Sequence, residues 1–241
     1  MKEKIAQLQQ IIDNSRRIVF FGGRGVSTES GIPDFRSQDG LYNQKYKFPP
    51  EVILSHDFFM TRTADFYDFY RDKMLALDAK PNAAHRWLAQ LEQKGKLSAI
   101  VTQNIDGLHQ MAGSRIVYEL HGTVHSNFCR LCGKFYTAED ILNSTGIPTC
   151  DCGGYIKPKV VLYDENLDMD IVNRSINAIA TADTVIVAGT SLTVYPAAGL
   201  LRHFNGTNLV LINHDTTHMD GKADLVIHGS VGEVLSQIEI R

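Results

Sequence analysis

The chain has 241 residues, of which 44% are hydrophobic and 21% are charged. This length and composition are typical of a globular protein with one large domain and room for a small insert. A formal net charge of −3 gives no overall field that would attract nucleic acid or an anionic membrane. The sequence has neither a long apolar run nor a signal-peptide pattern, which favours a cytoplasmic protein, and a monomer is expected because no feature demands an oligomer.

Predicted helices and strands alternate along most of the chain. Residues 3–15 carry apolar side chains at helical spacing, and residues 18–21 form a short apolar run typical of a buried strand. Further strands are predicted at 98–102, 116–120, 184–188, 208–212 and 223–227, with helices at 81–92, 170–182, 194–204 and 231–238. The aromatic-rich residues 37–80 are predicted to be mostly helical, and their aromatic stripe fits either a core or the wall of an apolar tunnel. Strands and helices that alternate in this way predict a Rossmann-like α/β fold, a parallel sheet with helices on both faces.

A glycine-rich turn follows the first predicted strand. Gly22, Gly23 and Gly25 allow a tight turn and a close approach of backbone to a ligand. Residues 26–30 are predicted to begin a helix, whose N–H groups and dipole would face a pyrophosphate. The usual dehydrogenase fingerprint would need a third glycine where Thr28 stands, so a plain turn in an α/β core is the alternative. Residues 30–36 bring an acid, an aromatic and a base beside this turn, as in a loop that folds over a ligand.

Polar residues follow two other predicted strands. Gln103, Asn104 and Asp106 come directly after residues 98–102, where open α/β sheets build their sites, although a turn with an Asx cap is equally compatible. His121 follows residues 116–120 and precedes a glycine. An imidazole suits a general base because its ordinary pKa lies near neutrality.

Four cysteines occur as two close pairs, Cys129-x-x-Cys132 and Cys150-x-Cys152. In a secreted protein they could form two disulfides, but the tight spacing favours one metal site. Four thiolates around Zn²⁺ leave no position for water, so the site would be structural. Residues 124–157 are therefore predicted to be a small zinc-ribbon module, inserted in a discontinuous Rossmann-like domain of residues 1–123 and 158–241.

Several of these motifs, in this order, resemble those of the bacterial-type sirtuins, the NAD-dependent protein deacylases. Residues 23–36 match the family pattern G-A-G-x-S-x-x-S-G-I-P-D-F-R except at Arg24, where the family has alanine. Residues 102–109 match T-Q-N-I-D-x-L-H, and residues 121–122 match H-G. Residues 157–165 are similar to R-P-x-V-V-x-F-x-E, the segment that pairs with the substrate peptide in that family.

The resemblance implies a role for each matching residue. His121 would be the general base, and Asn104 would share in catalysis. Those implied at the cofactor are Gly23, Arg24, Gly25, Ser27 and Glu29 at the pyrophosphate and ribose, Asp34, Phe35 and Arg36 near the nicotinamide, Gln103, Asn104 and Asp106 at the nicotinamide ribose and carboxamide, and Gly189, Thr190, Ser191, Asn213 and Val231 at the adenosine half. Val160, Val161 and Tyr163 would bind the substrate, and Cys129, Cys132, Cys150 and Cys152 would hold one structural zinc ion.

The implied activity is NAD-dependent deacetylation of lysine in proteins or peptides. NAD would be cleaved to nicotinamide, and the acetyl group would be transferred to ADP-ribose after His121 takes a proton from a ribose hydroxyl. Protein ADP-ribosyltransferase or NAD glycohydrolase activity is the alternative, because both share the cleavage step. Arg24 could contact the pyrophosphate, or it could block the site and leave a non-catalytic NAD-binding module. Tyr67 lacks an arginine three residues later, which predicts a preference for acetyl over succinyl groups.

Overall fold

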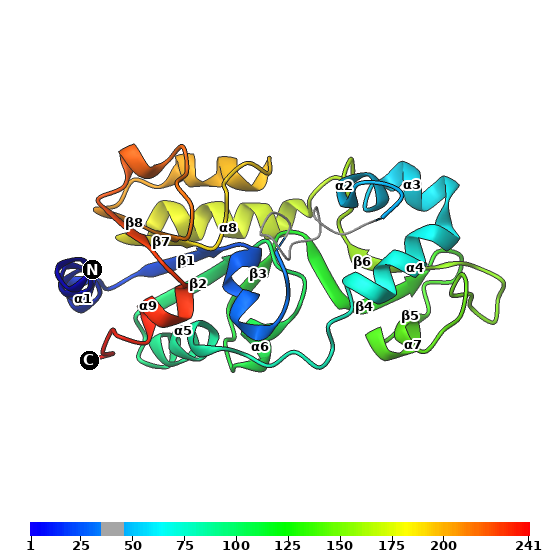
Figure 1. Ribbon diagram of the computed structural model, residues 1–241, viewed down its shortest axis with the longest axis horizontal. Coiled ribbons are helices and arrows are strands. Elements are labelled where there is room, and N and C mark those ends of the chain that lie inside the picture. The colour runs from blue at the N-terminus through cyan, green and yellow to red at the C-terminus, as the bar shows by residue number, and fades with distance from the viewer. Residues whose placement is uncertain (35–45) are drawn as a thin grey trace.

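The computed structural model describes residues 1–34 and 46–241 (Figure 1). In chain order its elements are α1 (Lys2–Asn14), β1 (Ile18–Gly22), η1 (Arg24–Val26), η2 (Thr28–Ser30), α2 (Pro50–Ile53), α3 (His56–Thr61), α4 (Thr63–Lys73), α5 (Ala83–Gln93), β2 (Leu97–Thr102), α6 (Leu108–Met111), β3 (Val117–Glu119), β4 (Gly122–Cys129), β5 (Phe135–Tyr136), α7 (Ala138–Leu142), β6 (Ile156–Val160), α8 (Met169–Thr181), β7 (Thr184–Ala188), η4 (Ala197–His203), β8 (Asn208–Asn213), η5 (Asp220–Lys222), β9 (Leu225–His228) and α9 (Val231–Leu235). Elements labelled η are 3₁₀ helices. Among the described residues, no helix is long and apolar enough to cross a membrane.

The larger lobe is built on a parallel sheet of six strands in the order β3-β2-β1-β7-β8-β9. The chain moves outward from β1 through β2 to β3, and then returns to the other side of β1 at β7. The point between β1 and β7 is therefore the topological switch point, where ligands bind in open α/β sheets. The predicted Rossmann-like fold is confirmed.

Helices cover both faces of this sheet, with α8 on one face and α5, α6 and α9 on the other (Figure 1). The alternation of side chains along β1 explains why both faces are apolar. Ile18 and Phe20 lie in one core with α1, α5 and α9, whereas Val19 and Phe21 lie in a second core with α8 and η4. Every residue of β1 is buried, as expected for a central strand covered on both sides.

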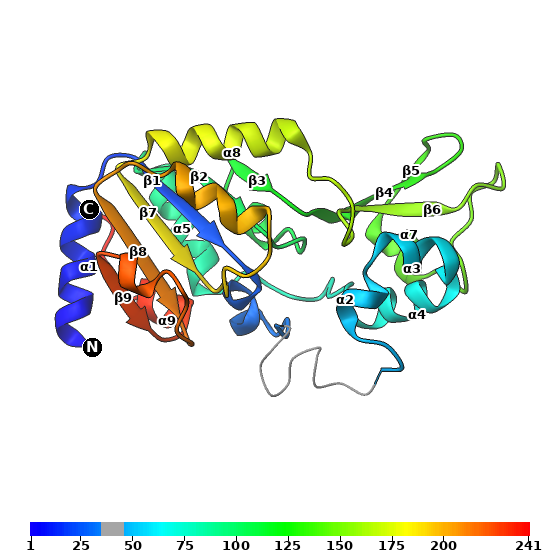
Figure 2. The same ribbon diagram turned by 90° about the horizontal axis from the view of Figure 1, so that it is seen from above.

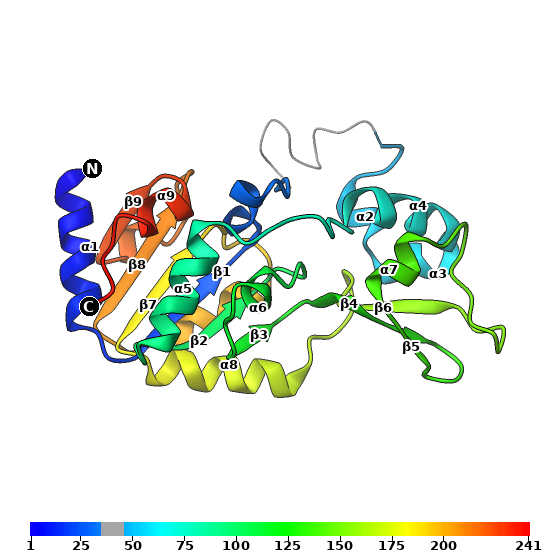
Figure 3. The same ribbon diagram turned by 90° about the horizontal axis from the view of Figure 1, so that it is seen from below.

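The smaller lobe contains an antiparallel sheet in the order β5-β4-β6, with α2, α3, α4 and α7 packed beside it (Figures 2 and 3). One core unites residues 53–75 with residues 124–162, and Phe59, Phe66, Tyr67 and Tyr70 are at its centre. The aromatic stripe is therefore core. The predicted module of residues 124–157 shares this core with the helices of residues 50–73, and its boundaries stay a prediction.

The chain after β1 differs from the prediction. Residues 24–30 form two short 3₁₀ turns and not the start of an α-helix. The chain bends at Ser27, with φ −98° and ψ 0°, and Gly31 in the left-handed conformation ends the second turn. The expected helix dipole is therefore replaced by separate N–H groups in a tight turn. The helices predicted at 194–204 and 231–238 are also shorter, at residues 197–203 and 231–235.

Candidate cofactor site and metal centre

The predicted site residues gather at the carboxyl ends of four neighbouring strands. β1, β2, β7 and β8 end at Gly22, Thr102, Ala188 and Asn213, and each is followed by a segment that the sequence analysis selected. Because these strands are parallel and adjacent, the segments after them meet at one edge of the sheet, at the switch point. The loops far apart in sequence are thus brought together by the strand order alone.

Glycines allow the turns after β1 and β7 to pack backbone against backbone. The amide of Gly25 donates to the carbonyl of Gly189 over 2.8 Å. A Cβ atom on Gly25 would lie 2.8 Å from the Cα of Gly189, and one on Gly23 would lie 2.7 Å from the Cβ of Thr190. Gly189 has φ +60°, and a Cβ there would lie 2.4 Å from the amide nitrogen of Val26. Side chains at these positions would separate the two turns.

A chain of hydrogen bonds connects the turn after β1 with the loop after β2. The hydroxyl of Ser27 donates to Asp106 over 2.6 Å, and the side-chain amide of Asn104 donates to the same hydroxyl over 3.0 Å. Asp106 also accepts from the amide of Leu108 and so fixes the start of α6. Gln103 extends the network to the turn after β7, because its side-chain amide donates to Thr190 over 3.2 Å. Five predicted residues therefore form one polar wall.

Asn213 provides an unused donor on the opposite side. Its Oδ1 accepts from the amide of Thr190 over 2.9 Å, but its Nδ2 has no hydrogen-bond partner among the described residues. Asn213 is only 7% exposed, and a buried donor left unpaired costs about 1–3 kcal/mol. An orphaned donor beside a glycine-lined turn fits a site for a polar ligand such as a dinucleotide.

Three other predicted cofactor residues have different surroundings. Glu29 accepts a hydrogen bond from the amide of Gly232 over 2.7 Å, so its carboxylate connects η2 to α9. Val231 is 3% exposed and belongs to the first core, which leaves little of its side chain for a ligand. Ser191 is exposed and its hydroxyl lies 2.8 Å from that of Thr193.

Arg24 turns toward the segment that follows the 3₁₀ turns. Its Nε donates to the carbonyl of Pro33 over 2.6 Å. Burial lowers the pKa of Arg24 to about 10, opposed by the charges of Asp106 and Asp34 and by Tyr163, so the guanidinium remains charged near neutral pH. Arg24 therefore interacts with both the predicted cofactor residues and the predicted substrate segment. The predicted residues Phe35 and Arg36 lie outside the described part of the chain.

His121 lies between the cofactor loops and β6. Its Nδ1 is 3.1 Å from the carbonyl oxygen of Gln103. A carbonyl can only accept, so Nδ1 carries the proton and Nε2 holds the free electron pair. Burial lowers the pKa of His121 and the Gln103 carbonyl raises it, with burial the stronger influence. The ring is therefore neutral near pH 7 and is able to accept a proton.

The predicted substrate segment is held by two backbone bonds, one to the residue before β4 and one to the residue after α2. Val161 donates to the carbonyl of His121 over 2.9 Å, and Tyr163 donates to the carbonyl of Leu54 over 2.9 Å. Val160 is buried in the core of the smaller lobe, whereas Tyr163 is 37% exposed. Gly122 has φ +74°, and a Cβ there would lie 2.0 Å from the carbonyl oxygen of Lys159. The segment thus crosses directly over the residue next to His121.

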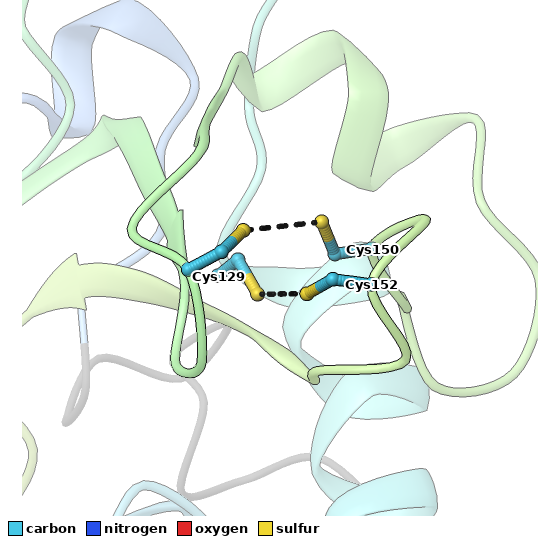
Figure 4. Close-up of side chains that lie close together, drawn as sticks. Cys129, Cys150 and Cys152 are labelled. Carbon is cyan, nitrogen blue, oxygen red and sulfur yellow. Dashed lines mark hydrogen bonds between the residues drawn. The ribbon is translucent and has the colours of Figure 1, made fainter.

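The four cysteines converge in the smaller lobe (Figure 4). The sulfurs of Cys129 and Cys152 are 3.4 Å apart, those of Cys132 and Cys150 are 3.6 Å apart, and all four lie within 4.8 Å of one another. Tetrahedral zinc with Zn–S bonds of about 2.3 Å places its sulfurs roughly 3.8 Å apart. The set therefore fits one zinc ion with four thiolate ligands, and all four cysteines are free of disulfides.

Two residues that support the site were not predicted. Asn82 donates from its side-chain amide to the carbonyl of Val26 and to the hydroxyl of Ser30. Glu165 accepts from Lys157 over 3.0 Å and from the amide of Leu162 over 2.9 Å, so it holds the substrate segment in its bend. Glu165 is the final acid of the R-P-x-V-V-x-F-x-E pattern, and that match was the available signal. Asn82 offered only the signal of a helix cap.

A parallel sheet with a glycine-lined switch point, a neutral histidine beside it and a lobe with four cysteines define a class of protein. The class is a dinucleotide-binding α/β protein with a second, metal-stabilised lobe. A sequence model of the Sir2 family matches residues 23–196. The chain belongs to the Sir2 family.

Relatives similar in sequence cover almost the whole chain. A protein of Clostridium acetobutylicum named NAD-dependent protein deacetylase is 59% identical over 240 residues, which is 98% of each chain. A protein of Clostridium perfringens with the same name is 57% identical and covers 99% of each chain. These identities extend the family match to both lobes and to the C-terminal residues beyond 196.

Solved structures agree with the fold. A Sir2 complex with a deacetylated p53 peptide and 3′-O-acetyl ADP-ribose superposes with a TM-score of 0.90 at 40% identity, over 97% of this chain and 96% of that one. A Sir2 complex with a p53 peptide and NAD⁺ gives a TM-score of 0.85 at 41% identity, over 96% and 95%. The arrangement of the two lobes is thus that of the family.

Proposed function

We propose that this protein is an NAD-dependent protein-lysine deacetylase. The observation that carries the proposal is the position of His121, a neutral base with a fixed tautomer between the switch point and the segment of residues 160–163. Relatives up to 59% identical bear the name NAD-dependent protein deacetylase, which supports the same activity here. The substrates are proteins or peptides that carry acetyl-lysine.

NAD binds along the edge of the sheet in this proposal. The turns at Gly23, Gly25 and Gly189 pack backbone against backbone at the switch point, where a pyrophosphate would bind, and Asn213 offers its unpaired Nδ2 to the adenosine half. Gln103, Asn104 and Asp106 face the nicotinamide half, since they follow β2 and Asn213 ends β8, on the opposite side of the switch point. Ser27, in the turn after β1, connects that turn to the residues at the nicotinamide half through its bonds to Asn104 and Asp106.

The proposed reaction requires a general base from the protein and does not require a nucleophilic side chain. Bound NAD supplies a ribose carbon that becomes electrophilic as nicotinamide leaves. His121 would receive a proton from a ribose hydroxyl at Nε2, while its Nδ1–H continues to donate to the Gln103 carbonyl. Asn104 is 7% exposed and orients the ribose from a fixed position, because its side chain is held by Ser27. Zinc is structural and takes no part in the reaction.

The substrate peptide adds a strand beside residues 160–163. This segment is held through the amides of Val161 and Tyr163, which donate to the carbonyls of His121 and Leu54. A peptide that pairs with it would direct its acetyl-lysine toward His121. The proposed enzyme acts in the cytoplasm, which is supported by the zinc-type arrangement of all four cysteines.

Arg24 favours a second candidate, an NAD glycohydrolase or ADP-ribosyltransferase. Its side chain reaches Pro33 and interacts with Asp106 and Tyr163, between the cofactor residues and the substrate segment. A guanidinium in that position would hinder the approach of an acyl-lysine more than the approach of water. In that case NAD would be cleaved without transfer of an acetyl group.

One assay separates the candidates. The purified protein is mixed with NAD and an acetyl-lysine peptide, and nicotinamide and deacetylated peptide are quantified together. Equal amounts of both products, lost in His121→Ala, support the deacetylase. Nicotinamide without deacetylated peptide would move the assignment to the second candidate, and Arg24→Ala should then restore the equal amounts. NAD binding without release of nicotinamide from either variant would mean a non-catalytic module.

A further inference from the structure

The turn of residues 24–30, here called the cofactor turn, has little regular structure of its own. Its internal backbone bonds span three residues, as from Val26 to Gly23 and from Ser27 to Arg24. Such 3₁₀ turns are short and have poorer hydrogen-bond geometry than an α-helix. The exact placement of its N–H groups therefore depends on side chains from other elements.

Ser27 attaches the cofactor turn to the loop after β2 through Asn104 and Asp106. Asn82, the residue before α5, forms a second attachment. The Nδ2 of Asn82 donates to the carbonyl of Val26 over 2.8 Å and to the hydroxyl of Ser30 over 3.0 Å. Asn82 is 8% exposed, so water does not compete strongly for these bonds.

The other half of the same amide caps α5. The Oδ1 of Asn82 accepts from the backbone amide of Ala84 over 2.9 Å, and the backbone amide of Asn82 donates to Nδ1 of His85 over 3.2 Å. This is a capping box, and α5 behind it is fixed in the first core by Trp87 and Leu88. The position of Asn82 is therefore fixed by α5, and its side chain can hold the cofactor turn in place.

Capping alone does not require asparagine. Serine and aspartate cap helices about as well, because a cap needs only a side-chain oxygen. The bond to the Val26 carbonyl needs a donor, which the side-chain nitrogen of Asn82 supplies, and the same nitrogen donates to the Ser30 hydroxyl. Asn82 thus has two separable roles: it caps α5, and it bonds to the cofactor turn.

We infer that Asn82 is a positioning residue that fixes the cofactor turn for NAD. The inference rests on the proposed function in so far as NAD is the ligand of that turn. Asn82 does not touch the ligand in this account. It acts through the Val26 carbonyl and the Ser30 hydroxyl, and its loss raises the KM for NAD while kcat at saturating NAD changes little.

The test compares variants that keep the helix cap with one that removes a cap elsewhere. Asn82→Ser retains an oxygen for α5 but cannot reach Val26, and Asn82→Asp retains the shape but replaces the donors by acceptors. Thr137→Ala is the matched control, because Thr137 forms the capping box of α7 in the smaller lobe with Asp140. For each variant, KM for NAD, kcat and the stability to urea are measured, and hydrogen exchange is followed at residues 24–31.

We expect Asn82→Ser and Asn82→Asp to raise KM for NAD about tenfold with kcat within about twofold of the native protein. Exchange at residues 24–31 should be faster in both, and Thr137→Ala should change neither KM nor this exchange. An unchanged exchange in both Asn82 variants, or an equal rise of KM in Thr137→Ala, would overturn the inference. If the native protein neither binds nor cleaves NAD, the proposed function fails, and exchange at residues 24–31 alone decides the role of Asn82.

Discussion

Two buried histidines should make the stability of this protein depend steeply on pH. His85 and His109 lie with ring centroids 4.7 Å apart, and both are fully enclosed. Burial lowers the pKa of His85 from 6.5 to about 4, opposed by the charge of Asp106 and reinforced by that of Arg86. Burial also lowers the pKa of His109 well below its ordinary value, with a further contribution from His85.

The sign and size follow from proton binding. Between pH 6.5 and about 4 the unfolded chain binds a proton at His85 that the folded chain does not, so the free energy of unfolding falls as pH falls. At about 1.4 kcal/mol per pH unit, the shift of His85 alone corresponds to about 3 kcal/mol across that window. This is a large share of the stability of an ordinary domain.

The assay is urea unfolding of the native protein and of His85→Gln, at several pH values from about 7.5 to 4.5. Glutamine can keep the capping box with Asn82, because Gln is a normal residue at that position, but it does not titrate. The variant should therefore lose less stability on acidification, by about 1 kcal/mol per pH unit below pH 6.5. Equal pH slopes in the two proteins would refute the reasoning, since carboxylates elsewhere affect both alike.

Three other results are expected. Activity should fall on the acid side only below about pH 6.5, because burial lowers the pKa of His121, and a pH profile of kcat with an acid limit well above that value would contradict a neutral base. Removal of zinc by a chelator should abolish deacetylation by loosening the smaller lobe while NAD still binds, as measured by calorimetry and by near-ultraviolet circular dichroism. Succinyl-lysine peptide should be turned over more slowly than acetyl-lysine peptide, since Tyr67 and Tyr70 are buried in the core and cannot meet a carboxylate. Faster turnover of the succinylated peptide would show that another residue recognises the acid.

Much of the larger lobe could be predicted because its signals are local. The apolar runs at 184–188 and 208–212 match β7 and β8 to within one residue, since central parallel strands are apolar on both faces. The site at the strand ends was predictable for the same reason. Once β1, β2, β7 and β8 are neighbours, Gln103, Thr190 and Asn213 must lie at one edge of the sheet.

The parts that were missed depend on contacts between distant residues. The turn after β1 is bent because Gly25 packs on Gly189, a contact that no local pattern shows. Asn82 is separated from Val26 by 56 positions, and its sequence signal is satisfied by a helix cap alone. The core that joins residues 53–75 to residues 124–162 likewise has no local sequence signal, and the boundaries of the module at residues 124–157 stay a prediction.

One strand leads from the proposed base to the metal centre. β4 begins at Gly122, the residue after His121, and ends at Cys129, the first of the four cysteines. At about 3.3 Å per residue, the strand separates the two sites by roughly 25 Å. Both ends are nonetheless bonded to β6, at Gly122 and at residues 127–129, with a shift of register between them.

A distant metal could therefore imitate a catalytic one in a biochemical assay. Disorder at Cys129 would be transmitted along β4 and would displace His121 from the Gln103 carbonyl without any change in the chemistry of the site. Inhibition by chelators, or a dependence of kcat on added zinc, would then reflect the position of His121 and not Lewis-acid catalysis. Metal substitution distinguishes the two, because an ion that preserves the fold of the lobe should preserve kcat whatever its Lewis acidity.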